Sequence, residues 1–489
     1  MQNTPSNNLL RLTFSGFSWN VAGNITRSIA GFVINIFLAR LLGPEPFGLV
    51  ALAMIVISIG ALVIESGLSS ALIQKNEINN SDISFIFTIQ ISLAVFLALA
   101  IFLLAPWLSI FFSNPAIVPV LQALALLLFI QSFAQVPTAL LRRKLNFKRL
   151  QKAQIISYLT GYLGVGLPLA YFGWGVWSLV LAQITQAMLN TIIVFLSARH
   201  AITINLHGSK QLASFGVKIL GANVANWIIQ NIDNALIGRQ FGATSLGLYS
   251  RAYFLGYTPA GIILPSAQMA IFSSVSKTGK SEETKKLFLS FYGAFVMLLI
   301  PISMLIVLAA NEIILIIYGP SWLLAANILT PVAIAMPFYA IMGLEGPVLN
   351  GLGRPGIEVR IQWSVAIIAV VILMIASQIS FLVTAWSMVL IAMLRFFLMT
   401  VQLKKVLELT WVKLIKVALP GVLFAIVIGL AWILSTLWLP KIEAVFWSFT
   451  IRAFVGLSAG LVIAYLGRKT LFFEITNAIK EILSSSRML

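Results

Sequence analysis

Five charged side chains interrupt apolar stretches and are the residues best suited to chemistry inside a membrane. They are Arg27, Glu65, Asp233, Arg251 and Glu345. A charge placed at mid-helix in a membrane costs about 2.5–3.5 kcal/mol on insertion scales, so such residues usually face a partner or a water-filled cavity. In that setting a guanidinium can bind an anion, and a carboxylate can carry a proton or a sodium ion.

Arg27 and Glu65 lie in two successive apolar runs, at similar distances from the turn between them. At the helical rise per residue, their depths differ by only about 5 Å. Two compatible interpretations follow: Arg27 contacts a phosphate or sugar in transit, or Arg27 pairs with Glu65. Gly23 and Gly31, on either side of Arg27, are expected to leave space for a ligand.

Asp233 and Arg251 also lie at similar depth, close to a later turn. They could form an ion pair that fixes a helical hairpin, or they could act as a gate or substrate contact. Glu345 is a further candidate for a gate or an ion carrier. Arg395 is expected to extend its side chain to the membrane interface.

Asparagines make the two runs that carry Arg27 and Asp233 unusually polar. Hydrogen bonds between helices would explain them. Contact with sugar hydroxyls along a substrate path would explain them equally well. The candidates for this path, besides Arg27, are Asn24, Asn35, Asn223, Asn231 and Asn234.

A basic run follows the fourth apolar stretch, in the sequence RRKLNFKRLQK, and contains no acidic residue. Its first interpretation is a topology determinant that holds this junction in the cytoplasm. Its second is an electrostatic collar that gathers an anionic head group at the cytoplasmic entrance. The collar residues would be Arg142, Arg143, Lys144, Lys148 and Arg149.

The composition indicates an integral membrane protein. Of 489 residues, 60% are hydrophobic and 9% are charged, whereas soluble domains carry about 25% charged residues. There is no cysteine, the two histidines share one short polar segment, and the N-terminus lacks the pattern of a cleaved signal peptide. The sequence has no ATP-binding motif and no metal-ligand cluster, which disfavours an enzyme, a metal site or a cofactor. A transporter would then use a proton or sodium gradient, or downhill removal of its product.

About fourteen apolar runs could cross the membrane, and each must be a helix because lipid offers the backbone no hydrogen-bond partner. Basic residues concentrate in every second junction, so these junctions and both termini are expected in the cytoplasm. This bias explains most of the net charge of +18. Membrane lipids are a second expected partner of these residues, and nucleic acid is disfavoured because there is no folded basic module. The predicted spans are 13–42, 47–74, 82–111, 116–141, 150–172, 175–198, 212–241, 245–274, 286–311, 322–350, 357–378, 381–403, 414–437 and 444–466.

An internal repeat organises these spans. A shift of 199 residues aligns Gly43 with Gly242 and Gly48 with Gly247, without a gap. Both pairs belong to a Gly-x4-Gly-Leu turn, in which glycine permits a tight reversal. The shift covers an even number of spans, so the two halves share one orientation, as in transporters built from parallel repeats. We expect an all-α membrane protein with two parallel six-helix lobes and two extra C-terminal helices. The expected parts are 1–206, 207–410 and 411–489.

One segment carries a family pattern, Asp-x3-Ile-Gly-x2-Phe-Gly-x4-Gly-x-Tyr, from Asp233 to Tyr249. With the helix plan and the basic run, it makes the chain resemble the polysaccharide-exporter branch of the multidrug/oligosaccharidyl-lipid/polysaccharide (MOP) flippases, in particular the Wzx-type and colanic-acid-exporter-type proteins. The resemblance covers nearly the whole chain. It implies movement of an undecaprenyl-pyrophosphate-linked oligosaccharide across the bacterial inner membrane by alternating access. Other polysaccharide-assembly proteins stay open as partners.

Two other transporter classes stay open. A cation-coupled exporter of small organic molecules, of the related multidrug type, should have a cavity dominated by acidic and aromatic groups. The scarcity of acids, together with Arg27 and the asparagines, favours the flippase. A flippase of the lipid-II type is harder to separate, because it would also carry a pyrophosphate.

Overall fold

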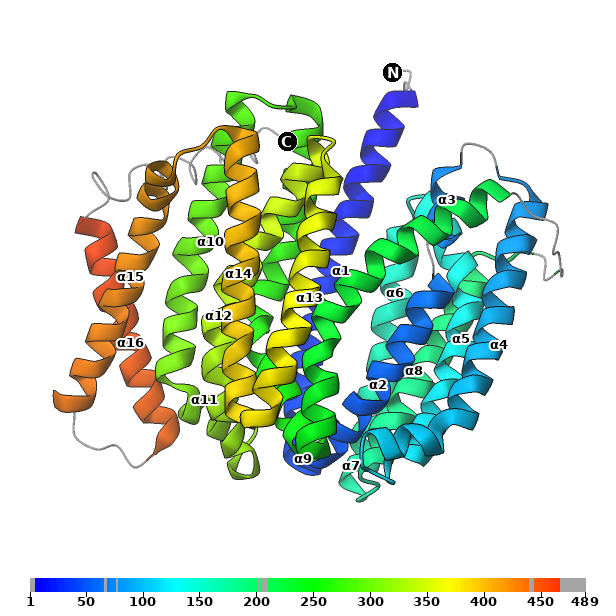
Figure 1. Ribbon diagram of the computed structural model, residues 1–489, viewed down its shortest axis with the longest axis horizontal. Helices are drawn as coiled ribbons and strands as arrows, with labels where there is room; N and C mark the ends of the chain where they lie inside the picture. The colour runs from blue at the N-terminus through cyan, green and yellow to red at the C-terminus, as the bar shows by residue number, and fades with distance from the viewer. Residues whose placement is uncertain are drawn as a thin grey trace. The chain divides into compact units, whose positions relative to one another are not determined.

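The protein is a bundle of α-helices joined by short turns, as a computed structural model shows (Figure 1). The structure describes residues 5–65, 68–75, 78–200, 203, 210–438 and 444–466. Within these residues, 12 helices are long and apolar enough to cross a membrane. The two limbs of the kinked helix α9 (Lys210–Thr278) complete the predicted set. The expected all-α, multi-pass membrane fold is confirmed.

The described residues divide into two compact units, Met1–Ser250 and Arg251–Leu489. The lobe boundaries predicted at 206 and 410 stay a prediction. In the first unit, α5 packs against α2, α4 and α8, and α6 packs against α1 and α8. The helices of this unit before α9 are α1 (Pro5–Leu42), α2 (Pro44–Glu65), α3 (Leu68–Gln74), α4 (Asn80–Phe111), α5 (Ile117–Arg143), α6 (Phe147–Tyr158), the π-helix η1 (Leu159–Gly166), α7 (Leu167–Tyr171) and α8 (Val176–Ser197).

In the second unit, α10 packs against α12 and α15, and α14 packs against α12 and α13. The last helix, α16, packs against α15 and α11, so the C-terminal hairpin is attached to the unit through both α10 and α11. The elements after α9 are α10 (Glu282–Leu308), α11 (Ala310–Ile317), the 3₁₀ helix η2 (Pro320–Ala325), α12 (Ala326–Gly351), α13 (Pro355–Ile379), α14 (Phe381–Leu407), α15 (Trp411–Trp438) and α16 (Val445–Leu466).

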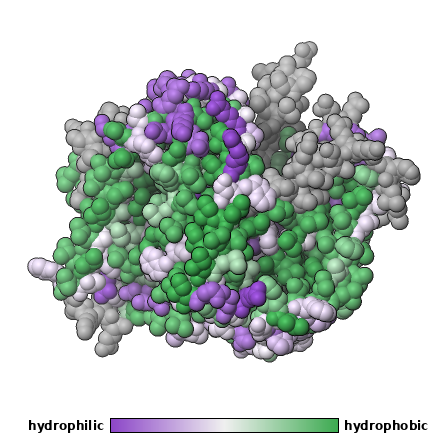
Figure 2. Space-filling model, in the orientation of Figure 1, coloured by the Kyte–Doolittle hydropathy of each residue, from purple (hydrophilic) through white to green (hydrophobic). Residues whose placement is uncertain are grey.

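The outer face of α13 and α14 has the apolar surface of a protein in lipid. Figure 2 shows mainly hydrophobic side chains along these helices and hydrophilic ones toward their ends. Large side chains are exposed there, including Val371, Ile375, Leu390 and Phe397. Such a continuous apolar surface would not be stable in water.

Two tight turns occupy equivalent positions of the internal repeat. Gly43, between α1 and α2, has a φ of 71°, and Gly242, at the kink of α9, has a φ of 80°. These values lie in the left-handed region, where a side chain would be strained. The two glycines were predicted from their alignment, and the structure confirms the reversal at both.

Two described helices fill the predicted span 47–74. They are α2, described to Glu65, and α3, described from Leu68, and residues 66–67 lie outside the described residues. Gln90 of α4 is fully buried, and its Nε2 donates to the carbonyl of Ile64 on α2 (3.4 Å) and to Oγ of Ser69 on α3 (3.0 Å). This buried amide therefore joins α4 to both α2 and α3, a contact that hydrophobicity alone could not predict.

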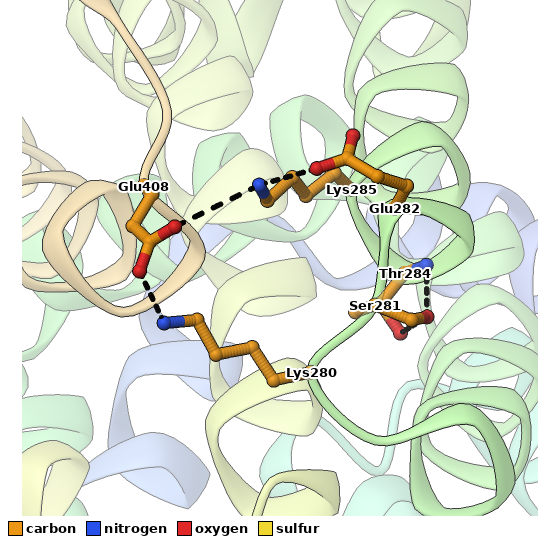
Figure 3. A network of polar contacts seen from close by, with 6 residues as sticks. All are labelled: Lys280, Ser281, Glu282, Thr284, Lys285 and Glu408. Carbon is orange, nitrogen blue, oxygen red and sulfur yellow. Dashed lines mark hydrogen bonds and ion pairs between the residues drawn. The ribbon is translucent and has the colours of Figure 1, made fainter.

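Polar contacts fix the junction between α9 and α10 in the second unit. The Ser281 hydroxyl accepts a hydrogen bond from the Thr284 amide and begins α10 as its N-cap. Lys280 binds Glu408, which follows α14, at 2.5 Å, and Lys285 lies 4.0 Å from the same carboxylate (Figure 3). This network ties the start of α10 to the end of α14.

Candidate functional site

A cavity of about 550 Å³ lies in the first unit, between α1, α2, α3, α5, α6, η1 and α8. Its charged lining residues are Arg27, Glu65 and Arg142. The lining therefore contains two arginines and only one carboxylate. The remaining polar lining is made of amides and hydroxyls. These residues are Ser69, Gln131, Gln135, Thr138, Gln154, Tyr162, Gln183, Gln186 and Asn190.

Arg27 is held in the cavity wall by neutral amides. Its Nη1 donates to Oε1 of Gln154 at 2.7 Å, and its Nη2 donates to Oδ1 of Asn24 at 3.3 Å. Glu65 lines the same cavity, but none of the ion pairs found among the described residues joins it to Arg27. The amides orient the guanidinium without neutralising it, which leaves its charge available to an anion.

The glycines around Arg27 do not leave open space, contrary to the prediction. A side chain at Gly23 would overlap Gln151 of α6 at 2.4 Å, and one at Gly31 would approach the Tyr158 hydroxyl at 3.1 Å. Both glycines instead allow α1 and α6 to pack closely, as small residues commonly do in membrane helices. This packing places Arg27 next to Gln154.

The amides of α5 and α8 were not predicted from the sequence. Gln131, Gln135 and Arg142 follow one face of α5, and Gln183, Gln186 and Asn190 follow one face of α8. The signal was present, because these polar residues recur at helical spacing within apolar runs. This pattern was not recognised because an uncharged amide lowers the mean hydropathy of an apolar run only slightly.

The predicted asparagines mostly bond to their own helices. Asn35 donates to the carbonyl of Gly31 at 2.8 Å and to the Tyr158 hydroxyl at 3.4 Å. Asn231 donates to the carbonyl of Trp227 at 3.0 Å, and Asn234 donates to that of Gln230 at 3.5 Å. Asn223 is exposed. Among the five, Asn24 is joined to a cavity residue through its bond to Arg27, and the role of all five in a substrate path stays a prediction.

Asp233 is buried, with 2% of its surface exposed, and accepts a hydrogen bond from the Tyr249 hydroxyl at 2.6 Å. This bond joins the two limbs of α9 close to the Gly242 kink. Arg251 belongs to the second unit, where its guanidinium lies 5.3 Å from the ring centre of Phe254. The ion pair between Asp233 and Arg251 stays a prediction.

Glu345 and Arg395 are both buried in the second unit. Oε1 of Glu345 accepts a hydrogen bond from the Thr400 hydroxyl of α14 at 2.6 Å, and Oε2 has no partner among the described residues. Arg395 has only 8% of its surface exposed, so the expected extension to the interface is wrong. Its position on α14 directs it into the helix packing.

The basic run has several separate contacts. Arg142 lines the cavity, whereas Arg143 donates to the carbonyls of Leu72 (2.9 Å), Ile73 (3.3 Å) and Lys75 at the end of α3. A cation at a helix C-terminus stabilises the free carbonyls there. Arg143 therefore has a clear structural role, and Arg142 keeps its potential for an anionic ligand.

The other three residues of the basic run also have different surroundings from one another. Arg149 donates to the carbonyl of Ser197 at 3.2 Å, and the Lys148 ammonium lies 5.0 Å from the ring centre of Trp19. Lys144 is exposed. The collar stays a prediction. Arg142, which lines the cavity, and Lys144, which is exposed, are its members best placed to meet an anionic ligand.

A multi-pass helical bundle with a polar, arginine-containing cavity defines the protein as a membrane transporter. A family model described as "Polysaccharide biosynthesis protein" matches residues 37–327, more than half of the chain. The chain belongs to this polysaccharide biosynthesis protein family.

Two relatives and one solved structure are similar over most of their length. The succinoglycan biosynthesis transport protein ExoT of Rhizobium meliloti is 26% identical over 355 residues, covering 72% of this chain and 71% of that protein. The lipopolysaccharide biosynthesis protein WzxC of Escherichia coli is 23% identical over 350 residues, covering 70% of this chain and 69% of that protein. The lipid II flippase MurJ, in an inward closed conformation, superposes with a TM-score of 0.78 at 13% identity, over 93% of this chain and 99% of that chain. The last similarity concerns the fold.

Proposed function

We propose that this protein flips an undecaprenyl-pyrophosphate-linked oligosaccharide from the inner to the outer leaflet, for surface polysaccharide synthesis. The observation that carries this function is the cavity with Arg27, Arg142 and an amide-rich wall. A pyrophosphate cannot enter low dielectric without cations and water along its route. The family, and relatives named for succinoglycan and lipopolysaccharide, support a glycan cargo.

Arg27 is the proposed contact for the pyrophosphate in mid-passage. Its guanidinium is oriented by Gln154 and Asn24 and faces the cavity. Arginine can bind two phosphate oxygens at once, which gives geometry as well as charge. Glu65, on the same cavity, would be a second partner for Arg27 in a conformation other than the one described, in which Gln154 and Asn24 hold the guanidinium.

The two alternative classes fit less well. A multidrug-type exporter is disfavoured because Glu65 is the one acidic residue among the lining residues of this cavity. The lipid-II-type flippase shares the fold, since MurJ superposes over nearly its whole length. The family match favours a surface-polysaccharide precursor over the cell-wall precursor.

The remaining features of the proposal follow from the charges. The chain would lie in the bacterial plasma membrane, with both termini and the basic junctions in the cytoplasm. Coupling to a proton or sodium gradient would use Glu65, Asp233 or Glu345. Arg142 and Lys144 would attract the anionic head group to the cytoplasmic entrance.

The test is complementation of surface polysaccharide in a bacterial strain that lacks its own flippase and makes the matching glycan. Arg27→Ala should abolish complementation, while Arg27→Lys, which keeps the charge but loses the bidentate fork, should retain part of it. Arg360→Ala removes an exposed arginine of α13 and should complement normally. Protein abundance in the membrane is measured for each variant.

Two outcomes would oppose this function. If the unaltered chain inserts and accumulates but never restores the polysaccharide, with matching glycan present, it is not the flippase for that glycan class. If Arg27→Ala complements fully at ordinary abundance, Arg27 is a packing residue and does not contact the substrate.

A further inference from the structure

One wall of the cavity is built from regularly spaced amides. On α5, Gln131 and Gln135 are four residues apart, and on α8, Gln183, Gln186 and Asn190 recur at intervals of three and four. This spacing places each set on one helix face. Because α5 packs against α8, the two faces meet at the same cavity. Oδ1 of Asn190 is buried and has no hydrogen-bond partner among the described residues.

An aromatic pair adjoins the amides through an unusual helix. Between α6 and α7 the chain adopts a π-helix, η1, a form that often occurs at functional sites. A side chain at Gly161 of η1 would lie 2.6 Å from the carbonyl oxygen of Ala182 on α8, so only glycine allows this approach. The close packing brings Tyr162, which lines the cavity and stacks on Tyr158 at 4.8 Å, next to the amides of α8.

This combination suits a sugar better than an ion or an apolar molecule. Each amide has both donors and acceptors, as does each sugar hydroxyl, so one amide can satisfy neighbouring hydroxyls. An aromatic ring offers an apolar face to the C–H face of a sugar ring. A cation site would need several oxygen ligands with charge, and an apolar drug would need an apolar lining.

We propose that Gln131, Gln135, Gln183, Gln186, Asn190 and Tyr162 form a glycan subsite that distinguishes a glycosylated lipid pyrophosphate from the bare lipid. This inference rests on the proposed flippase function and adds a division of roles. Arg27 binds the pyrophosphate whatever sugar it carries. The neutral amides bind the first sugars, so the subsite favours hydroxyl-rich, uncharged residues.

The experiment measures equilibrium binding to the full chain in lipid nanodiscs. Two radiolabelled probes are used: undecaprenyl pyrophosphate, and the same lipid carrying a neutral hexose tetrasaccharide. The unaltered protein should bind the glycosylated probe more tightly. Gln135→Met and Gln183→Met keep side-chain volume but remove the amide, and each should weaken that binding by roughly two- to tenfold, the range of one lost hydrogen bond. Binding of the bare lipid should not change.

The controls separate this inference from the function on which it rests. Gln122→Met alters a glutamine of α5 that bonds to the Phe102 carbonyl outside the cavity, and it should behave as the unaltered protein. Gln135→Asn retains a shorter amide and should lose less than Gln135→Met, which guards against a general folding defect. Equal binding of both probes, or variants that keep the full preference, would overturn the subsite alone. Binding of neither probe would overturn the flippase function, and the subsite with it.

Discussion

Gly48 and Gly247 pack reciprocally, each against the backbone of the other's hairpin. A side chain at Gly48 would lie 1.7 Å from the Ala243 carbonyl oxygen, and one at Gly247 would lie 1.9 Å from the Pro44 carbonyl oxygen. The shift of 199 residues that aligns the two glycines also aligns Pro44 with Ala243. The two copies of the repeated turn are therefore in direct contact. Each copy places its glycine against the equivalent carbonyl oxygen of the other copy.

We predict that Gly48→Ala and Gly247→Ala are similarly destabilising. In each case a methyl group meets backbone, which cannot rotate away, and overpacking of this kind costs about 1–3 kcal/mol or more. The two changes disturb one contact, so the double variant should lose less than the sum of the single losses. The measurement is the fraction of detergent-purified protein that stays monodisperse after heating.

Gly356→Ala is the matched control for this prediction. Gly356 lies in the first turn of α13, and a side chain there meets nothing within 4 Å. Its substitution should leave the melting curve unchanged or raise it slightly. If Gly48→Ala and Gly247→Ala melt like Gly356→Ala, the reciprocal packing is wrong.

A second prediction concerns Asp233. Tyr249→Phe removes the hydroxyl that donates to the buried carboxylate, and an unpaired buried acceptor costs about 1–3 kcal/mol. Tyr249→Phe and Asp233→Asn should therefore each lower thermal stability, and their double-mutant cycle should show coupling. A parallel cycle with Asp233→Asn and Arg251→Gln tests the ion pair predicted from the sequence. Strict additivity in either cycle would rule out the corresponding partner.

A third prediction concerns acid stability at the junction of α9, α10 and α14. The Lys280 ammonium, hydrogen-bonded to Glu408, holds the pKa of that carboxyl below its usual value, with a further contribution from Lys285. A lowered pKa in the folded state contributes stability above the unfolded value of about 4.3, which is lost as the pH falls through the lowered folded value. The difference in melting temperature between the unaltered protein and Glu408→Gln should therefore shrink below about pH 4.

The effect at Glu408 should be small and sensitive to salt, because the carboxylate is mostly exposed. Glu283→Gln is the control, since Glu283 forms no ion pair among those found in the described part of the chain. A pH-independent difference for Glu408→Gln would mean that the network contributes through packing and not through charge.

The fourth prediction concerns topology. Reporter fusions at Phe147, the first residue of α6, and at Ser281, the N-cap of α10, should report a cytoplasmic location, because both lie beside basic residues. Fusions at Asn114 and Pro320, in junctions without Lys or Arg, should report the outside. The physical reason is the retention of short basic loops in the cytoplasm. An external signal at Phe147 would reverse the proposed orientation.

The sequence predicted the membrane helices and their repeat because both depend on strong local signals. Apolar runs must be helical in lipid, and a turn such as that at Gly242 needs a residue that tolerates a positive φ. The hydrogen bonds of Gln90 to Ile64 and Ser69 were not predicted, because these residues are distant in sequence. Long-range hydrogen bonds of this kind leave no periodic signal.

The candidate site was predicted in part. Arg27 was identified because a charge in an apolar run is conspicuous, and it does face a cavity. The amide-bearing wall was missed, because Gln135 and Gln186 are neutral and come together only when α5 and α8 are packed against each other. The Tyr249 hydroxyl that donates to Asp233 was not predicted, and the ion pair of Asp233 with Arg251 stays a prediction.

The reciprocal packing of Gly48 and Gly247 resembles an isologous interface, in which one surface patch meets its own copy across a twofold axis. Such interfaces usually join two identical chains, yet here both copies belong to one polypeptide. The two turns therefore act as equivalent partners within one chain, and neither glycine can be filled without displacing the backbone of the other turn.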